Sequence, residues 1–512
     1  MPLAPPLAAQ QSPLRRRTVA EDLQMFSQVY NQLRVNHADS LDAHRLIMAA
    51  ITGMVQAADP HSYVVASVRL DAEKERLRQE GKLVPVPLSF TYVGGAPVVV
   101  GIVPGSAAAS ADILPGDELV AIEGKPVRAE SAFELDVTLA GTRRAPVTLT
   151  FERRRADGSL VQLVRTVQRE RTDEITAVPA AFMLDGETGY LRITAFENLK
   201  VADDVHDALG RLEGAGMRRL VLDLRDNPGG IVREAARVAG EFLPKGTLLY
   251  TQSGRKADVA DTGRVERSFW SQEKRYPMVL LVNQGSASAS ELVAGALQDH
   301  DRALVAGRPT FGKSLLMQGF PLSDGSVAMI VVGQVRTPCG RVVQREYRDV
   351  TVREYYRQSR AQRDTAGRPS CRTSGGRVVY GGGGIVPDLR LPEPEPAPVW
   401  LARLEEAQLP LQWVGGHVAA SASSYPSLDA LAARPALADG ALAAFRAFAR
   451  AQGATPPDGA DADRLLEHRL LLGVAATRWG QEGYYRLAAQ LDPEVAAARG
   501  AFAGAAALVG AR

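Results

Sequence analysis

Short apolar runs alternate with helix-like segments between residues 185 and 345, and this alternation constrains the fold more than any other feature of the sequence. The runs are too short for helices and are rich in Val, Leu and Ile, which is typical of strands buried on both faces. Alternating strands and helices predict an α/β core with a mixed, largely parallel sheet. The expected strands are 190–193, 220–224, 278–282 and 303–306, and the expected helices are 201–214, 231–242 and 288–299.

Three further segments differ from this core in their pattern. Residues 18–70 carry apolar residues at helical spacing, and Thr18 with Glu21 forms a capping-box pattern. Residues 83–170 are short β-rich runs separated by turns, which predicts a compact binding module inserted before the core. Residues 400–512 are rich in Ala and Leu and predict an α-helical C-terminal region. We therefore expect four parts, at 18–70, 83–170, 175–392 and 400–512.

The composition excludes several classes of protein. The 512 residues include 60 Lys and Arg and 58 Asp and Glu, so the net charge of +2 gives the whole chain no attraction for nucleic acid. No uncharged apolar run approaches the ~20 residues that a membrane-spanning helix needs. Two cysteines are too few for an all-cysteine zinc site, and the histidines show no metal-ligand spacing.

The cysteines, the N-terminal residues and an Arg-rich stretch are each consistent with two interpretations. Cys339 and Cys371 form either one disulfide bond or two separate thiols. The N-terminal residues 1–17 are either a disordered tail or the remnant of an export signal, because their positive charge follows the small residues instead of preceding them. The Arg-rich stretch 353–377 is expected to be a solvated insertion, with binding to an acidic or nucleic-acid partner as the alternative.

A run of small residues follows the expected strand 278–282. Residues 283–291 read NQGSASASE and open the next helix. A hydroxyl at a strand-to-helix junction suits a nucleophile, because the amides at the start of a helix stabilise a developing oxyanion. The same small residues also suit an N-cap that only packs closely. The residues alone leave both interpretations open.

A serine nucleophile needs a base, and Lys313 is the best-placed candidate. It lies in the uncharged segment 309–316 (PTFGKSLL), where burial would lower its pKa from about 10.4 toward neutrality. A lysine that protects a sheet edge is the alternative.

A third segment, 220–230 (LVLDLRDNPGG), places two glycines directly after a strand. Consecutive glycines let backbone N–H groups approach a ligand, as in an oxyanion hole, and an ordinary turn is the alternative. Asp223 and Arg225 share one face of the strand, so they are able to pair with each other.

Together and in this order, these segments resemble the carboxyl-terminal processing peptidases, or tail-specific proteases. That family is marked by a DLRxNxGG strand-turn, a SASASE nucleophile segment and a TFGK base segment, and all three are present. Further matches lie at 53–63, 337–341 and 384–388, so the resemblance covers about residues 20–392. It implies a serine endopeptidase that works through a Ser/Lys dyad and an acyl-enzyme, without metal or cofactor. It also implies protein or peptide substrates that are cleaved at or near their C-terminal regions.

The resemblance assigns roles to individual residues. The family's nucleophile corresponds to Ser288 and its general base to Lys313. Its oxyanion donors correspond to the backbone amides of Ala289 and of Gly229 or Gly230.

One position departs from the family pattern. The family places a Gln four residues after the lysine, where it helps to hold the base, but Met317 stands there and Gln318 follows. A shift of one residue on a strand turns a side chain to the other face unless a bulge restores it. Gln318 is therefore expected to orient Lys313 only if a bulge lies at 314–316.

Residues 83–170 resemble a PDZ domain, which this family uses to bind substrate C-termini. Its interior matches at 114–117 (LPGD) and 122–124 (IEG). In such domains a peptide adds as a strand, and the backbone amides of a Gly-rich loop hold its carboxylate. The equivalent loop here, 84–90 (VPVPLSF), contains two prolines, which have no N–H to donate. The module is therefore either a reader of C-termini or a lid or spacer.

The resemblance further implies export to the bacterial periplasm or cell envelope. The helical C-terminal region packs on the core, forms a homo-oligomer interface or binds an adaptor, and its residues do not decide among these roles. The rival hypothesis from another class is a catalytically silent PDZ scaffold that keeps the peptidase fold and binds partners without cleaving them.

Overall fold

A computed structural model of the chain describes residues 18–65, 82–93, 96–102, 106, 108, 111, 113, 117–129, 132–141, 144–154, 160–170, 177–266, 272–323, 326–348, 355, 365–393, 395, 397–407 and 409–510. The N-terminal tail 1–17, the PDZ-like residues 114–116 and most of 349–364 lie outside the described residues. Within the described ranges, no helix has both the length and the apolar character needed to cross a membrane.

The central sheet of the core is mixed and largely parallel, which confirms the predicted α/β arrangement. Its strands, in spatial order, are β19 (Leu389–Arg390), β14 (Leu304–Gly307), β13 (Met278–Val282), β10 (Arg219–Asp223), β9 (Thr188–Arg192) and β8 (Ala180–Met183). Neighbours are parallel except β8, which runs antiparallel to β9. The carboxyl ends of the parallel strands therefore meet along one edge of the sheet.

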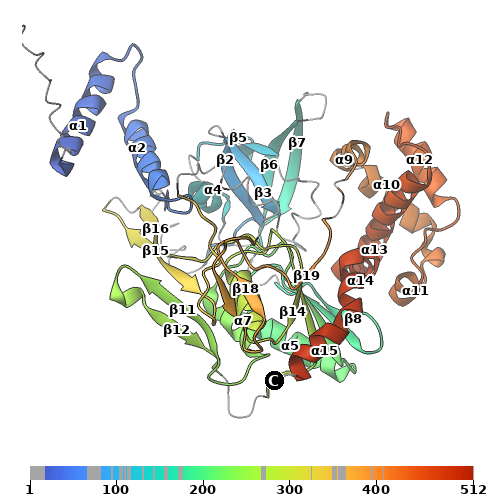
Figure 1. Cartoon of the computed structure of the whole chain (residues 1–512). Coiled ribbons are helices and arrows are strands. Elements are labelled where there is room, and N and C mark those ends of the chain that lie inside the picture. The colour runs from blue at the N-terminus through green and yellow to red at the C-terminus, as the bar shows by residue number, and fades with distance from the viewer. Residues whose placement is uncertain are drawn as a thin grey trace, which may run out of the picture.

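Helices from distant parts of the chain cover the two faces of this sheet. One face packs against α5 (Val201–Gly214), α6 (Val232–Gly240) and α7 (Ala289–Asp299), which connect the strands. The other face, which includes Val221 and Leu281, packs against α14 (Pro493–Gly500) and α15 (Phe502–Gly510). The C-terminal region therefore supplies part of the peptidase-like core, as Figure 1 shows at its lower right.

A second, antiparallel sheet lies beside the core. Its order is β1 (Tyr63–Val65), β16 (Val327–Arg336), β11 (Leu248–Gly254) and β12 (Asp261–Arg264), and β15 (Leu315–Pro321) also pairs with β16. The short helix η3 (Ala257–Val259) and the ribbon of β17 (Ser370–Arg372) with β18 (Val378–Tyr380) complete this part. Strand β1 ties the N-terminal helices to the core, because Tyr63 pairs with Met329.

The expectation that 353–377 is a solvated insertion holds for most of the residues that the structure describes there, but it is wrong for Tyr355 and Thr373, which are buried. Tyr355 is only 1% exposed. Arg377 forms ion pairs with Asp301 (2.6 Å) and Asp388 (2.6 Å). The sequence concealed this burial because it depends on partners far away along the chain. Of the two alternatives for the cysteines, the structure shows the disulfide, Cys339–Cys371.

The β-rich module has the PDZ-like order that the sequence indicated. Its strands are β2 (Leu88–Val93), β3 (Ala96–Ile102), β4 (Glu118–Ile122), β6 (Pro146–Arg154) and β7 (Leu160–Gln168), with β5 (Lys125–Pro126) on β4 and one helix, α4 (Ala132–Leu139). The module has its own buried core, which includes Leu119, Leu135 and Phe151. In the 84–90 loop, the Val84 amide donates to Gly141 (2.7 Å) and the Leu88 amide donates to Val86 (2.8 Å).

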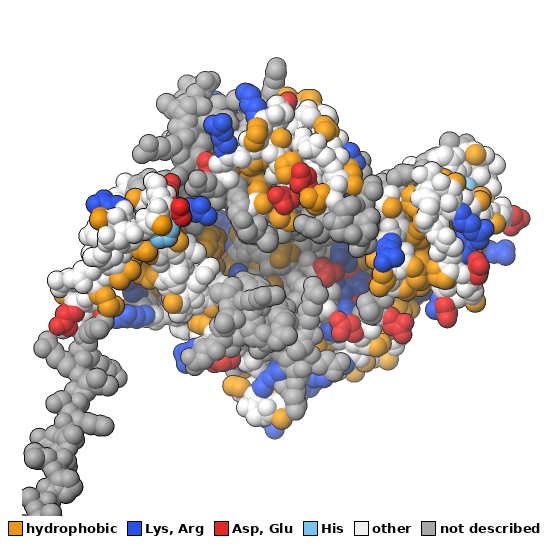
Figure 2. All heavy atoms as spheres, turned by 90° about the horizontal axis from the view of Figure 1, so that it is seen from above, with side chains coloured by type: hydrophobic (Ala, Val, Ile, Leu, Met, Phe, Trp, Pro, Cys, Tyr) orange, Lys and Arg blue, Asp and Glu red, His pale blue; other side chains and the backbone are white. Residues whose placement is uncertain are grey.

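Helices form the two ends of the described chain. At the N-terminal end, α1 (Val19–Asn36) has the predicted Thr18–Glu21 capping box, and the Asp42 side chain caps α2 (Ala43–Ala58). At the C-terminal end lie α9 (Val399–Glu406), α10 (Leu409–Ala420), η5 (Ala422–Ser424), α11 (Leu428–Ala433), α12 (Ala441–Ala451) and α13 (Ala460–Leu491), which share a buried cluster. Seen from above in Figure 2, these two ends lie on opposite sides of the body and carry apolar side chains among charges of both signs.

Candidate active site

The strand-to-helix turn after β13 holds Ser288 in a strained conformation. Ser288 is the N-cap of α7 and has a φ of +55°. A non-glycine residue in this region costs about 1–3 kcal/mol, and such residues cluster at functional sites. The neighbouring serines have structural partners: Ser286 Oγ donates to the Leu224 carbonyl (2.7 Å) and Ser290 Oγ donates to the Asn227 carbonyl (2.9 Å). Of the three serines in the segment, Ser288 lines the pocket described below.

The glycine-rich turn after β10 lies directly against this serine. A Cβ atom on Gly229 would lie 2.8 Å from the Ala289 nitrogen and 2.6 Å from the Ala287 carbonyl oxygen, so only glycine fits there. The Gly229 amide donates to Asn227 Oδ1 (2.9 Å). Gly230 is exposed. Gly229 therefore lies against the turn that holds Ser288 and its N–H already has an acceptor, whereas Gly230 lies against the Phe196 backbone.

Glu291 connects the serine turn to the lysine segment. Its carboxylate is 1% exposed, and Oε2 accepts from the backbone amides of both Ser288 (2.9 Å) and Lys313 (2.8 Å). Oε1 accepts from the Gly312 amide (2.7 Å) and from Thr310 Oγ1 (2.5 Å). Glu291 was not predicted as a site residue, although a Glu three positions after a helix N-cap is a recognisable capping signal. One buried carboxylate thus sets the spacing between the two expected catalytic residues.

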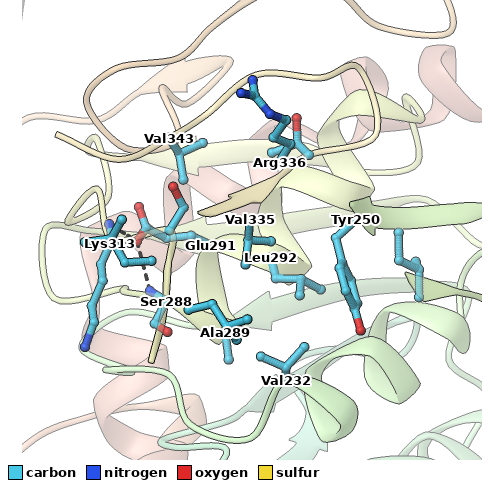
Figure 3. A pocket seen from close by; sticks show the side chains of 15 residues that line it. Val232, Tyr250, Ser288, Ala289, Glu291, Leu292, Lys313, Val335, Arg336 and Val343 are labelled. Atoms are coloured by element: carbon cyan, nitrogen blue, oxygen red, sulfur yellow. Dashed lines mark hydrogen bonds between the residues drawn. The ribbon is translucent and has the colours of Figure 1, made fainter. Parts of the chain in front are cut away.

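Ser288 and Lys313 line the same pocket, and Figure 3 shows their side chains together at one end of it, across from Tyr250. Most of the remaining wall is apolar. Among the described residues, no hydrogen bond joins Ser288 Oγ to Lys313 Nζ. The residues that form the apolar wall are Val232, Leu249, Tyr250, Ala289, Leu292, Leu315, Leu316, Val335 and Val343.

The surroundings of Lys313 make its charged form less favourable than it is in water. Burial lowers the pKa of Lys313 below its ordinary value of 10.5, while the Glu291 carboxylate acts in the opposite direction. Burial also lowers the pKa of His61 to about 4, and the charge of Lys313 adds to this effect. His61 is therefore a neutral neighbour of the lysine.

Segments far apart in the sequence enclose this lysine. His61 Nε2 lies 3.0 Å from the Tyr355 hydroxyl, which also accepts from Gln344 Nε2 (2.9 Å). Two hydrogen bonds of 2.9 Å join Gln344 to Ser314. The Ser314 backbone amide donates to Gln344 Oε1, and the Gln344 backbone amide donates to Ser314 Oγ. The residue after the base is thus anchored by a glutamine that the sequence did not single out.

The structure does not bring Gln318 to this pocket. Gln318 is exposed on β15 and pairs with Ile330. The register shift between β15 and β16 lies at 316/317, where Leu316 faces Gly333 and Met317 faces Val331. The extra residue therefore belongs to β16 and leaves the alternation of β15 unchanged. The bulge expected at 314–316 is absent from this described strand, so Gln318 is not turned toward Lys313.

Replacing Glu291 by glutamine tests how far this carboxylate couples the two segments. A glutamine places an NH₂ group where one oxygen accepts two N–H or O–H donors, so at least one buried donor loses its acceptor. We expect the free energy of unfolding to fall by about 1–3 kcal/mol. We also expect kcat on casein to fall at least ~100-fold, because small displacements of reacting groups are costly.

Glu234→Gln is the matched control for this variant. Glu234 is also fully buried and accepts a backbone amide, that of Ala202 (3.0 Å), but it contacts neither catalytic segment. We expect Glu234→Gln to lower the unfolding temperature and to leave kcat within about 3-fold of wild type. Equal losses of kcat in the two variants would show that Glu291 acts only on stability.

Comparison with known proteins identifies two domains and several relatives of this chain. Residues 187–352 match peptidase family S41, and residues 98–153 match the PDZ domain. A carboxy-terminal-processing protease of Bartonella bacilliformis is 30% identical over 331 residues, which cover 63% of this chain and 73% of that protein. A probable CtpA-like serine protease of Staphylococcus aureus is 29% identical over 329 residues, or 64% of each chain. The solved structure of a photosystem II D1 C-terminal processing protease is 25% identical, covers 73% of this chain and 88% of its own, and has a TM-score of 0.43.

These matches show a serine peptidase that carries a PDZ domain. Within that class, the chain belongs to the carboxy-terminal-processing proteases of peptidase family S41.

Proposed function

We propose that this protein is an endopeptidase that cleaves protein or peptide substrates at or near their C-terminal regions, with Ser288 as nucleophile and Lys313 as general base. The observation that carries the proposal is the Glu291 carboxylate, which accepts hydrogen bonds from the amides of both residues at one pocket. Ser288 is strained, and burial lowers the pKa of the nearby Lys313. Both features favour an enzyme over a catalytically silent scaffold, because such features gather at catalytic sites.

The reaction begins when neutral Lys313 removes the proton from Ser288 Oγ. The oxygen attacks a peptide carbonyl carbon and forms a tetrahedral intermediate, and protonated Lys313 then gives the proton to the leaving amine. Water hydrolyses the resulting acyl-enzyme, with Lys313 again as the base. The flexible side chain of Lys313 brings Nζ within hydrogen-bond reach of Oγ when substrate binds.

We assign the oxyanion hole to the backbone amides of Ala289 and Gly230. Among the described residues, neither amide has a hydrogen-bond acceptor, whereas the Gly229 amide donates to Asn227 Oδ1. The Gly229 carbonyl and the Ile231 amide both bond to Phe196. Phe196 and Gly230 form an isolated parallel bridge, in which Phe196 bonds to the residues on either side of Gly230 and not to the Gly230 N–H. Of the two glycines that the sequence offered, this geometry supports Gly230.

The pocket and the PDZ domain bear on the choice of substrate. The apolar wall beside Ser288 favours an apolar side chain next to the scissile bond. In the PDZ loop, two positions are prolines and the Val84 and Leu88 amides already have acceptors. We therefore propose that this PDZ domain acts as a lid or spacer and does not hold a terminal carboxylate.

We propose that the protein works in the periplasm or cell envelope of a bacterium. The disulfide Cys339–Cys371 supports this location, because disulfides persist in oxidising compartments. The four-part division at 18–70, 83–170, 175–392 and 400–512 stays a prediction, supported by separate buried clusters in the PDZ domain and the C-terminal helices. The homo-oligomer or adaptor role of the C-terminal region also stays a prediction.

Covalent labelling tests the proposed chemistry. A fluorophosphonate probe reacts with an activated serine and leaves an adduct that mass spectrometry locates by residue. We expect one adduct, on Ser288, and loss of casein cleavage in proportion to labelling. Casein cleavage that persists after complete labelling, or an adduct on Ser286 or Ser290 instead, would contradict the assignment.

A further inference from the structure

A buried carboxylate of the C-terminal region contacts the catalytic part of the chain. Glu494, in the first turn of α14, is 6% exposed. Its Oε2 accepts a hydrogen bond from Arg225 Nη1 (2.6 Å), and its Oε1 accepts a hydrogen bond from Arg308 Nη1. The two arginine side chains are themselves nearly buried, with 9% and 12% of their surface exposed. Glu494 therefore lies between two buried cations that come from different strands of the central sheet.

Each arginine stands at the start of a catalytic loop. Arg225 follows β10 and shortly precedes the glycines of the proposed oxyanion hole, and Arg308 follows β14 and shortly precedes Lys313. Arg308 Nε also donates to Gln284 Oε1 (3.1 Å), and Gln284 stands after β13 in the segment that leads to Ser288. The Glu494 carboxylate thus connects, through Arg225 and Arg308, the segments at which all three loops begin.

Further charges fix α14 in this position. Arg225 Nη2 forms ion pairs with Asp223 (2.7 Å) and with Asp492 (2.7 Å). At the start of the helix, Asp492 Oδ1 accepts a hydrogen bond from the Glu494 backbone amide (2.7 Å). Burial works to raise the pKa of Asp223, but Arg225 and Arg192 lower it to about 2, so this carboxylate stays charged. Removing one member of a buried ion cluster leaves an uncompensated charge, which forces its neighbours to move.

We propose that Glu494 is a positioning residue of the peptidase, which aligns the oxyanion, nucleophile and base loops through Arg225 and Arg308. This inference rests on the proposed function of Ser288 and Lys313. It gives the C-terminal region a role in catalysis that is separate from any role in assembly: α14 must be docked for the three loops to hold their catalytic spacing.

Glu494→Gln tests the inference, and Arg499→Gln is the matched control. Arg499 lies on the same helix and joins it to the core through Asp185 (3.0 Å), away from the three loops. We expect Glu494→Gln to lower kcat on casein and the rate of fluorophosphonate labelling at least ~10-fold each, with KM within about 3-fold of wild type. Arg499→Gln is expected to change both rates less than 2-fold. The small probe reports on the loops themselves, since it needs no extended substrate contact.

The outcomes separate this inference from the proposed function. Wild-type protein that labels at Ser288 together with Glu494→Gln that labels equally fast would overturn the positioning role alone. Equal losses in Glu494→Gln and Arg499→Gln would also overturn it, because helix docking as a whole would then explain both. If Glu494→Gln does not fold, as judged by circular dichroism, Glu494→Asp takes its place: it keeps the charge but shortens the side chain, and the same loss of labelling rate is expected.

Discussion

Replacing Ser288 by alanine is expected to lower the rate of casein cleavage by at least about 10³-fold. The variant removes the oxygen that we propose forms the acyl bond, while the turn around it stays intact. Its strained φ of +55° and the hydrogen bond from its amide to Glu291 belong to the backbone and do not need the hydroxyl. Circular dichroism and the unfolding temperature are therefore expected to stay close to those of wild type. Initial rates on fluorescently labelled casein measure the loss.

Ser290→Ala is the control for that experiment. Ser290 lies on the same turn, and its hydroxyl donates to the Asn227 carbonyl (2.9 Å), which lies in the oxyanion turn. Loss of this hydrogen bond is expected to cost about 1 kcal/mol of stability and less than 10-fold in rate. If Ser288→Ala retained more than a tenth of wild-type activity, or if Ser290→Ala were the more damaged variant, Ser288 would not be the nucleophile.

Replacing Lys313 by methionine is expected to cause a loss of similar size, again at least about 10³-fold, because no group is left to accept the serine proton. The wild-type enzyme should show the matching dependence on pH. The amine is active when it is deprotonated, and burial lowers its pKa below the ordinary lysine value. Activity should therefore rise with pH through that lowered pKa and fall as acid protonates the amine. Values of kcat/KM measured across pH, with stability checked at each point, test this dependence.

Lys313→Arg distinguishes a base from a cation. Arginine keeps the positive charge but is not deprotonated in proteins. We expect it to be as inactive as Lys313→Met. If Lys313→Arg retained activity, or if the wild-type rate did not depend on pH in this direction, Lys313 would serve as a positive charge and the base would be another group.

Much of the core was predictable because its strands and helices depend on local pattern, whereas the roles of Ser288 and Lys313 were inferred from the resemblance of their segments to a known family. The apolar runs that form β10 and β13 are buried from end to end, and such runs can be recognised in the sequence without knowing which strands they pair with. The SASASE, TFGK and DLRxNxGG segments could be recognised in the sequence, and in the structure they follow β13, β14 and β10, whose carboxyl ends meet. The pairing of Asp223 with Arg225 was also predicted from their spacing, and the structure shows this ion pair (2.7 Å), although β10 ends at Asp223.

The misses depend on contacts between distant segments. Gln318 was carried over by its distance from Lys313, but its orientation depends on the register of β15 with β16, where the extra residue lies on the opposite strand. Tyr355 was assigned to a solvated stretch, although it is buried against His61 and Gln344. The local sequence around Gln318 or Tyr355 does not show which distant residues each of them will contact.

The sequence by itself determined which local pieces form: the strands, the helices, the catalytic segments and the glycines that allow close approach. Only the tertiary structure decided how those pieces are held. Glu291 joins the serine and lysine segments across a loop, and Glu494 joins the far end of the chain to all three catalytic loops. Buried charges are stable only beside their partners, and those partners become neighbours when the whole chain folds.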